Sequence, residues 1–233
     1  MTRNTKQQCL DDLRFRILTL DIRPGTVLDE ADLSAKYGVS RTPLREVFQR
    51  LAGEGFIALE QNRGAKVSSM DLTEMRTFFQ TAPMIYASAA RLAAENRTGA
   101  QLDELCENQE NFRRATQGGR ENAALLNHRF HELIGEMAHN AYLMPSLRRL
   151  LIDHTRLGQV FYQPASPQEH IRVVQAVDQH DAMIAAIEAQ EPAVAVDLTL
   201  QHWNLSRDRM ERFVQPDPLP HDVISLMEKK NAI

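Results

Sequence analysis

The chain of 233 residues exceeds one typical domain, and its 43% of hydrophobic residues is enough to build a core in each of two halves. Its formal net charge of −4 does not exclude a polyanionic partner, because residues 1–70 carry 11 Lys and Arg against 9 Asp and Glu. Cys9 and Cys106 lack the spacing of a zinc knuckle or a redox pair. With neither a secretory signal nor a membrane-length apolar run in the sequence, we expect a cytoplasmic protein that does not enter the membrane.

The first predicted helix has one apolar face and ends at Pro24-Gly25, which breaks the helical periodicity. Its apolar residues recur at helical spacing, at Leu10, Leu13, Ile17 and Leu20. A second, short helix is predicted over residues 30–37, after the cap residue Asp29. Gly38 suits the left-handed position that follows a helix, so the chain is expected to turn there directly into a third helix.

The third predicted helix starts at Ser40, and Pro43 fits its first turn because that position needs no N–H. Its buried stripe consists of Leu44, Val47, Phe48 and Leu51. Off that stripe or at the N-terminal end stand Arg41, Thr42, Arg45, Gln49 and Arg50. In a helix-turn-helix, this end of the second helix faces base edges in the major groove, where arginine suits phosphate oxygens and guanine. The alternative is that these arginines only solvate a helix face.

Two strands are predicted over residues 56–59 and 65–67, joined by a turn that contains Arg63 and Gly64. An exposed Arg63 at the tip of this turn would reach backbone phosphate or the adjoining minor groove. A hairpin that follows two short helices and a tight turn completes the pattern of a winged helix-turn-helix domain, which we predict over residues 1–70.

Residues 37–46, Tyr-Gly-Val-Ser-Arg-Thr-Pro-Leu-Arg-Glu, and residues 62–65, Asn-Arg-Gly-Ala, resemble the DNA-binding domain of GntR-family bacterial transcription regulators. The resemblance covers roughly residues 8–70. It implies that this domain binds double-stranded DNA through the polar residues of its third helix and through Arg63 with Gly64. Gln49 departs from the family pattern, since many relatives carry another arginine there.

Beyond Met70 the periodicity is helical throughout, and Asp71 with Glu74 has the arrangement of a helix start. Six helices are predicted, over residues 71–96, 100–116, 120–138, 141–162, 167–189 and 191–214. Because their connections are short, we expect an antiparallel all-helical bundle over residues 71–215. The Pro-containing tail, residues 216–233, is expected to leave the bundle. The predicted fold class is therefore mainly α, with an N-terminal winged helix-turn-helix and a C-terminal bundle.

Histidines interrupt three apolar faces of the bundle, at His131, His180 and His202, and Asn127 lies one turn before His131. An unsatisfied buried polar group costs about 1–3 kcal/mol, so these imidazoles are expected to share a partner. Neutral imidazole is the commonest protein ligand for a transition metal, and a divalent ion such as Zn²⁺ or Ni²⁺ would satisfy all three rings.

Other arrangements of these histidines remain open. The three rings could be ordinary core histidines that bond to backbone or to one another. His128 and His131, three residues apart, form a rival pair on a slightly rotated face. His154 and His170 are left outside the predicted set.

Residues 127–131, Asn-His-Arg-Phe-His, residues 180–187, His-Asp-Ala-Met-Ile-Ala-Ala-Ile, and His202 resemble the FCD effector domain of the FadR branch of the GntR family. With the N-terminal match, the resemblance covers nearly the whole chain. In those relatives an Asp or Asn and three His from separate helices bind a divalent metal, which holds a small carboxylate effector. By position, the resemblance implies a ligand set of Asn127, His131, His180 and His202.

Two features depart from the FCD pattern. Asn127 stands where Asp is more common, so the implied ligand set carries no charge. With neutral ligands, the whole positive charge of a bound ion would be available to attract an anion. A neutral set also permits a pocket that binds no metal. Residues 80–86 lack the arginine that relatives direct toward the effector, and Pro83 predicts a kink or break there. Arg156 is the substitute carboxylate partner that we consider, the alternative being a solvated or salt-bridged arginine.

The sequence thus predicts a ligand-responsive transcription regulator, a homodimer whose two third helices read a palindromic operator. Family precedent favours repression. We expect no enzyme, because the sequence has no nucleophile–base motif, phosphate-binding Gly loop or zincin-type His pair. The alternatives are a metal-dependent hydrolase and a helical interaction module without a small-molecule pocket.

Overall fold

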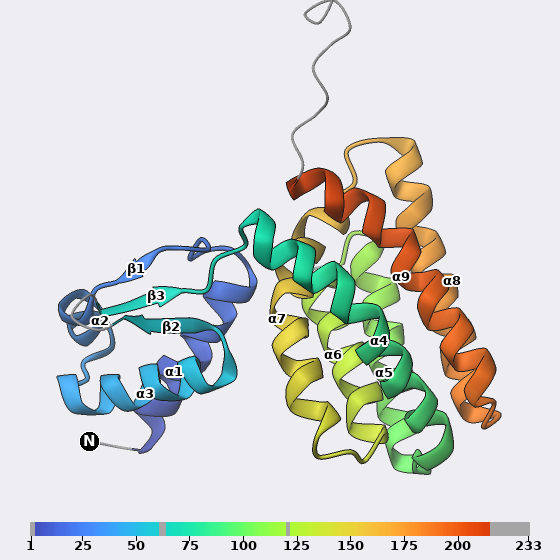
Figure 1. Ribbon diagram of the computed structural model, residues 1–233, viewed down its shortest axis with the longest axis horizontal. Helices are drawn as coiled ribbons and strands as arrows, with labels where there is room; N and C mark the ends of the chain where they lie inside the picture. Colours follow the sequence, from blue (N-terminus) through green and yellow to red (C-terminus); the bar gives the residue numbers. More distant parts are fainter. Residues whose placement is uncertain (1–2, 61–63, 120–121, 215–233) are drawn as a thin grey trace, which may run out of the picture.

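The computed structural model describes residues 3–60, 64–119 and 122–214. Within these ranges, three helices and a three-stranded sheet form an N-terminal winged unit, and six further helices form a bundle beside it (Figure 1). Each part has its own large hydrophobic cluster. None of the described helices is long and apolar enough to cross a membrane. The predicted tail, residues 216–233, lies outside the described residues.

The winged unit contains α1 (Arg3–Leu18), α2 (Glu30–Tyr37) and α3 (Arg41–Glu54). Asp29 caps α2, because its Oδ1 accepts the backbone N–H groups of Ala31 at 2.7 Å and Asp32 at 2.9 Å. Gly38 ends α2 in the left-handed conformation, with φ at 62°. Ser40 is the N-cap residue of α3, as predicted, although its side chain makes no capping hydrogen bond. The tight turn between α2 and α3 follows from this pair of cap residues.

An antiparallel sheet of β1 (Val27–Leu28), β2 (Ile57–Glu60) and β3 (Gly64–Val67) completes the winged unit. The spatial order is β1-β3-β2, and Ala58 pairs with Lys66 in the hairpin. The two predicted strands correspond to β2 and β3. β1 was not predicted, because two residues are too few to show an alternating pattern.

The bundle consists of α4 (Leu72–Asn96), α5 (Gly99–Thr116), α6 (Ala123–Met137), α7 (Leu143–Phe161), α8 (Pro167–Glu188) and α9 (Pro192–Val214). Several caps account for these starts. Asp71 accepts two backbone N–H groups of α4, Thr98 and Gln101 form a capping box on α5, and Ser166 caps α8. The predicted helices and their short connections are therefore present, with boundaries shifted by a few residues.

The longest bundle helix, α4, contains Pro83 but is one continuous helix from Leu72 to Asn96. The break considered from the sequence is therefore not found. α4 packs against α9 along much of its length and also contacts α6 and α7 (Figure 1). Its inward residues are mostly alanines, including Ala82, Ala89 and Ala93, which permit close approach of these neighbours.

Helix α7 lies between the bundle and the winged unit (Figure 1). Its residue Ile152 belongs to the hydrophobic cluster of the winged unit. The side chain of Gln159 donates to the backbone carbonyl of Leu18 at 3.1 Å. All residues from 151 to 159 are buried, because one side of the helix faces the bundle and the other faces α1 and α3.

Candidate functional site

α3 presents an open polar surface from its N-terminal end as far as Gln49. Arg41, Thr42, Arg45 and Gln49 are exposed, while the apolar stripe of Leu44, Val47, Phe48 and Leu51 is buried. The side chain of Arg45 is 65% exposed and has one ion pair, with Glu30 at 3.3 Å. A weak surface pair of this kind is readily exchanged for a base or phosphate contact. The helix therefore displays its polar residues as a DNA-reading helix requires.

The other predicted DNA contacts are placed differently. Arg50, in the C-terminal half of α3, donates to Glu54 at 3.3 Å and to Gln7 at 3.4 Å. It therefore stands apart from the surface formed by Arg41 and Arg45. Gly64 starts β3 with φ at 82° and is exposed, as a wing residue should be. Arg63 lies outside the described residues.

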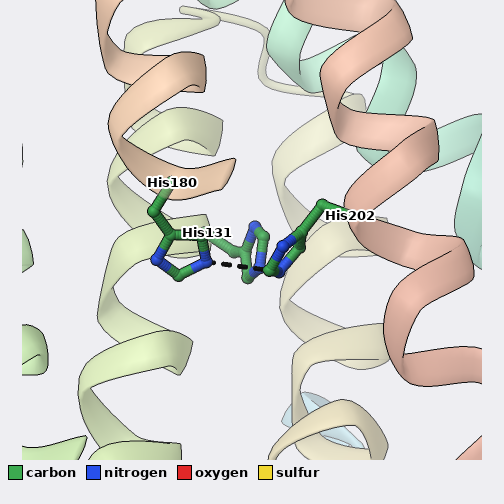
Figure 2. Close-up of side chains that lie close together, drawn as sticks. All are labelled: His131, His180 and His202. Carbon is green, nitrogen blue, oxygen red and sulfur yellow. Dashed lines mark hydrogen bonds between the residues drawn. The ribbon is translucent and has the colours of Figure 1, made fainter. Parts of the chain in front are cut away.

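Three histidines from three helices meet inside the bundle. His131 on α6, His180 on α8 and His202 on α9 each offer a ring nitrogen, and these nitrogens lie within 4.8 Å of one another (Figure 2). The shortest approach joins Nε2 of His180 to Nε2 of His202 at 3.2 Å. Nε2 of His131 is buried without a hydrogen-bond partner among the described residues. We call these three residues the histidine cluster.

Burial keeps the histidine cluster neutral. All three rings are at most 5% exposed. Desolvation lowers the pKa of His202 to about 4 and holds the pKa values of His131 and His180 well below the ordinary imidazole value. Neutral imidazoles have a free lone pair on one ring nitrogen, which is the form that binds a metal ion.

Glutamine side chains determine which nitrogen of two rings carries the proton. The amide N–H₂ of Gln109 on α5 donates to the backbone carbonyl of Val177 and to Asp181, at 3.0 and 2.9 Å. Its Oε1 lies 3.0 Å from Nδ1 of His180 and can only accept, so this nitrogen carries the proton. Nε2 of His180 therefore presents its lone pair to His202.

The ring of His202 is arranged in the same way. Its Nδ1 lies 3.1 Å from Oε1 of Gln179, so it also donates from Nδ1. Two Nε2 lone pairs then face each other across 3.2 Å, and a ring nitrogen of His131 lies within 4.8 Å of the ligand atoms of both rings. Lone pairs brought so close repel unless a cation or a proton lies between them, and partners on the remote nitrogen are typical of metal-binding histidines.

Asn127, the fourth predicted ligand, is 1% exposed and lies on α6 one turn before His131. Its Oδ1 accepts a hydrogen bond from the Tyr162 hydroxyl at 2.9 Å. A carbonyl oxygen has two lone pairs, so this contact orients the amide and leaves one acceptor position.

Comparison with known proteins covers both parts of the chain. Residues 79–205 match the FCD domain, and residues 5–67 match the gntR family of bacterial regulatory proteins. The FCD match alone includes more than half of the chain. The chain belongs to the GntR family, with a C-terminal FCD domain. It is therefore a DNA-binding transcription regulator, and the winged helix-turn-helix and helical bundle predicted from the sequence are confirmed.

Relatives of the regulator are themselves transcription factors. The HTH-type transcriptional repressor RspR of Escherichia coli K12 is 28% identical over 186 residues, covering 77% of this chain and 82% of the relative. The galactonate operon transcriptional repressor of the same strain is 26% identical over 207 residues, covering 78% and 90%. Among solved structures, Escherichia coli McbR/YncC has the same fold with a TM-score of 0.76 at 19% identity, covering 92% of this chain and 100% of that one. These relatives confirm that the regulator is not an enzyme.

His154 of α7, which was left outside the predicted set, lies beside the cluster. This ring is 4% exposed, its Nδ1 shares a 2.7 Å hydrogen bond with the Tyr86 hydroxyl, and its centroid lies 5.3 Å from that of His131. Burial lowers its pKa to about 3. Leu147 and Leu151 precede it at helical spacing, but a helix buried on two sides gives no clear apolar stripe. Gln109 was overlooked, although it follows Leu105 by four residues on the inward face of α5.

His128 and His170, the other histidines considered from the sequence, do not join the cluster. Nδ1 of His128 lies 2.7 Å from Thr155 Oγ1, so the rival pair of His128 with His131 is not what the side chains form. His170 is exposed near the start of α8. Among the described His, Cys, Asp and Glu residues, the one group with metal-ligand geometry is His131, His180 and His202.

The structure does not bring Arg156 to the histidine cluster. Its side chain is buried on the opposite face of α7 from His154, two residues or about 200° away around the helix. The guanidinium donates from Nη1 to Asp153 at 3.2 Å and to the backbone carbonyl of Ser68 at 3.1 Å. Arg156 therefore joins α7 to the segment between the two parts of the chain. The contact between Arg156 and a carboxylate effector at the histidine cluster, considered from the sequence, is not what this side chain is placed to make.

Proposed function

We propose that the regulator senses a small organic acid through a divalent metal ion held by His131, His180 and His202, with Asn127 as a fourth ligand. The observation that carries this proposal is the convergence of one ring nitrogen from each of three helices, together with the Nε2 of His131, which is buried without a hydrogen-bond partner in the described part of the chain. An ion at this point would replace the repulsion between lone pairs with three coordinate bonds.

The donor set fits a transition metal. Three neutral imidazoles and one amide oxygen are suited to Zn²⁺ or Ni²⁺ and carry no net charge. When bound, such an ion supplies its full positive charge and an open coordination position to an anionic ligand. The chain's own residues hold and orient the rings: Gln109 and Gln179 bond the remote nitrogens of His180 and His202, and Tyr162 holds Asn127.

The route from this pocket to DNA runs, in our proposal, through α7. One face of the helix carries His154, which contacts Tyr86 beside the histidine cluster. The other face carries Ile152, which packs in the core of the winged unit, and Gln159, which bonds α1. A ligand that favours one position of α7 would therefore also favour one position of the winged unit, provided that it binds the two arrangements with different affinity.

The two parts of the chain have different roles in this proposal. We propose that residues 1–70 bind DNA and that residues 71–215 bind the effector. The regulator acts as a cytoplasmic homodimer that reads a palindromic operator, because two copies of α3 related by a two-fold axis present two equivalent reading surfaces. Repression is the proposed direction, in keeping with the relatives named as repressors.

Elemental analysis tests the metal site. The purified regulator, dialysed against excess Zn²⁺ and then against buffer, is expected to retain one ion per chain. His180→Ala should lose it, whereas His170→Ala, which removes an exposed imidazole from the same helix, should retain it. A wild-type protein that retains no metal, or a His180→Ala variant that retains as much as the wild type, would refute the proposal and leave a metal-free pocket.

A further inference from the structure

A cavity lies between the winged unit and the bundle, and none of the histidine cluster lines it. Its volume is about 710 Å³, within the range of small-molecule sites. The winged unit contributes residues of α1, of the end of α3 and of the turn at Gly55, and the bundle contributes residues of α6 and α7. A ligand in this cavity would therefore contact both parts of the chain at once.

The wall of this junction cavity carries more positive than negative side chains. It includes four arginines, Arg14, Arg50, Arg148 and Arg149, and two glutamates, Glu54 and Glu132. Three carboxylates outside the wall also pair with its arginines: Asp11 with Arg14, Glu136 with Arg148 and Asp153 with Arg149. The wall itself therefore has a surplus of two positive charges.

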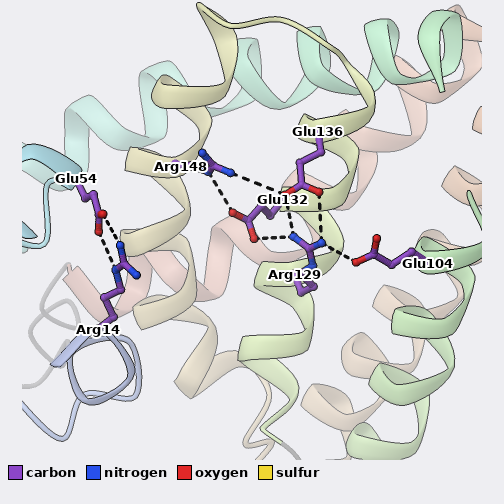
Figure 3. A network of polar contacts seen from close by, with 7 residues as sticks. All are labelled: Arg14, Glu54, Glu104, Arg129, Glu132, Glu136 and Arg148. Carbon is purple, nitrogen blue, oxygen red and sulfur yellow. Dashed lines mark hydrogen bonds and ion pairs between the residues drawn. The ribbon is translucent and has the colours of Figure 1, made fainter. Parts of the chain in front are cut away.

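Each wall glutamate is shared between two arginines. On the winged side, Glu54 accepts from Arg14 at 2.8 Å and from Arg50 at 3.3 Å. On the bundle side, Glu132 accepts from Arg148 at 3.2 Å and from Arg129 at 2.9 Å (Figure 3). A carboxylate shared in this way does not satisfy all the donors of two guanidiniums, each of which has five N–H groups.

Three of the four wall arginines are open to a ligand, and the fourth, Arg14, has a side chain that is 25% exposed. The side chains of Arg50, Arg148 and Arg149 are 55%, 57% and 42% exposed. Arg149 is also positioned across the junction, because its side chain packs so closely on Gly55 that an added Cβ would meet it at 2.3 Å. The cavity thus offers forked donors from both sides, the geometry that binds phosphate and carboxylate groups bidentately.

We propose that the junction cavity is a second ligand site, for a small polyanion that carries phosphate or carboxylate groups. The anion binds Arg148 and Arg149 of α7 on one side and Arg14 and Arg50 of the winged unit on the other. It holds the two parts in one relative orientation and so gives the regulator an input to DNA binding that does not depend on the histidine cluster.

Calorimetric titration at constant ionic strength tests this site, with inorganic pyrophosphate and citrate as the phosphate and carboxylate probes. One of the two is expected to bind saturably to the full chain, and the tighter probe identifies the class of anion. The double variant Arg148→Gln/Arg149→Gln should weaken that binding at least tenfold, and Arg148→Gln alone should weaken it measurably without disturbing the contact at Gly55. The control Arg76→Gln/Arg91→Gln removes the same charge from exposed positions on α4 and should bind as the wild type does.

A further variant distinguishes binding in the junction cavity from binding at the histidine cluster. His180→Ala should bind the probe as tightly as the wild type, whatever its metal content. Binding that disappears in His180→Ala but survives in the double arginine variant would place the probe at the histidine cluster and overturn the proposal. The proposal is equally overturned if neither probe binds the wild type, or if the double variant and the α4 control bind equally well.

Discussion

Individual hydrogen bonds decide what the histidine cluster can do. Because Gln109 gives its N–H₂ to Val177 and Asp181, its oxygen fixes the proton of His180 on Nδ1. This leaves Nε2 as a lone pair among neutral rings. Residues outside the proposed ligand set thus hold His180 in the form that an ion would bind.

Replacing Gln109 with Leu should weaken Zn²⁺ binding by about 10–100-fold, because His180 loses the partner that holds its tautomer and orientation. Competition with a chromogenic chelator measures this affinity. Gln117→Leu, at an exposed glutamine after the end of the same helix, serves as the control. Equal affinities in wild type and Gln109→Leu would show that the glutamine does not prepare the site.

Replacing Arg45 with Ala should lower affinity for the specific operator by about 1–3 kcal/mol if this side chain reads a base. The operator is first selected from a random DNA library, and fluorescence anisotropy then measures the dissociation constant. Arg91→Ala removes an arginine of nearly equal exposure, 67% against 65%, from the bundle and should have no effect. If Arg45→Ala binds the operator like the wild type, Arg45 is not a base-reading residue.

Buried histidines should make the metal-free regulator sensitive to mild acid. The unfolded chain binds protons on imidazole below about pH 6.5, whereas the folded-state pKa is about 4 for His202 and about 3 for His154. The free energy of unfolding is thus fully maintained above pH 6.5 and falls as the pH drops toward 4. The loss is about 1.4 kcal/mol per pH unit for each such histidine.

Urea denaturation between pH 7.5 and 5 measures this dependence, in a range where carboxylates remain mostly ionised. His154→Phe keeps a ring of similar shape but removes one titrating group, so its stability should decline less steeply. A free energy of unfolding that stays constant over this range would contradict the neutral, buried state of these rings.

At the scale of elements, α7 links the two parts of the chain, because it contacts both the histidine cluster, through His154, and the winged unit. Its contact with the winged unit depends on Gly55, which has φ at 91° and no room for a Cβ beside Arg149. An alanine at this position meets both a backbone penalty and a clash.

Gly55→Ala should lower the free energy of unfolding by more than the roughly 1–2 kcal/mol that a left-handed alanine costs. Adding Arg149→Ala should restore only the part of the lost stability that comes from the clash between the new Cβ and the Arg149 side chain. Gly53→Ala is the matched control, since Gly53 is helical with open space around it and alanine there should be neutral or stabilising. Chemical denaturation of the three variants measures these differences. A double variant no more stable than Gly55→Ala would argue against a close contact between Gly55 and Arg149.

Much of this arrangement could be predicted from the sequence. Periodicity and caps such as Asp29, Gly38 and Asp71 located the helices, and the apolar stripes placed His131, His180 and His202 on inward faces. Local patterns could not reveal β1, which forms only because β3 pairs with it. Local patterns also could not tell which of the two buried faces of α7 a given residue lies on. For this reason His154 was left outside the predicted site, and Arg156 was considered as a partner of the effector.

At the scale of the whole molecule, the regulator joins a winged DNA-binding unit to a bundle whose interior converges on three neutral histidines. The two parts meet at α7 and at the junction cavity. Occupancy inside the bundle can control DNA binding only if it changes the balance between arrangements of these parts. A coupling of about 1–3 kcal/mol is typical of such systems and corresponds to a 5–150-fold change in affinity.

The most direct test is the dissociation constant of the selected operator, measured by fluorescence anisotropy in metal-stripped and Zn²⁺-loaded protein. The account predicts that loading changes the wild-type constant by at least fivefold and leaves that of His180→Ala unchanged. Equal constants for stripped and loaded wild-type protein, with the ion verified as bound, would contradict coupling between the histidine cluster and the winged unit.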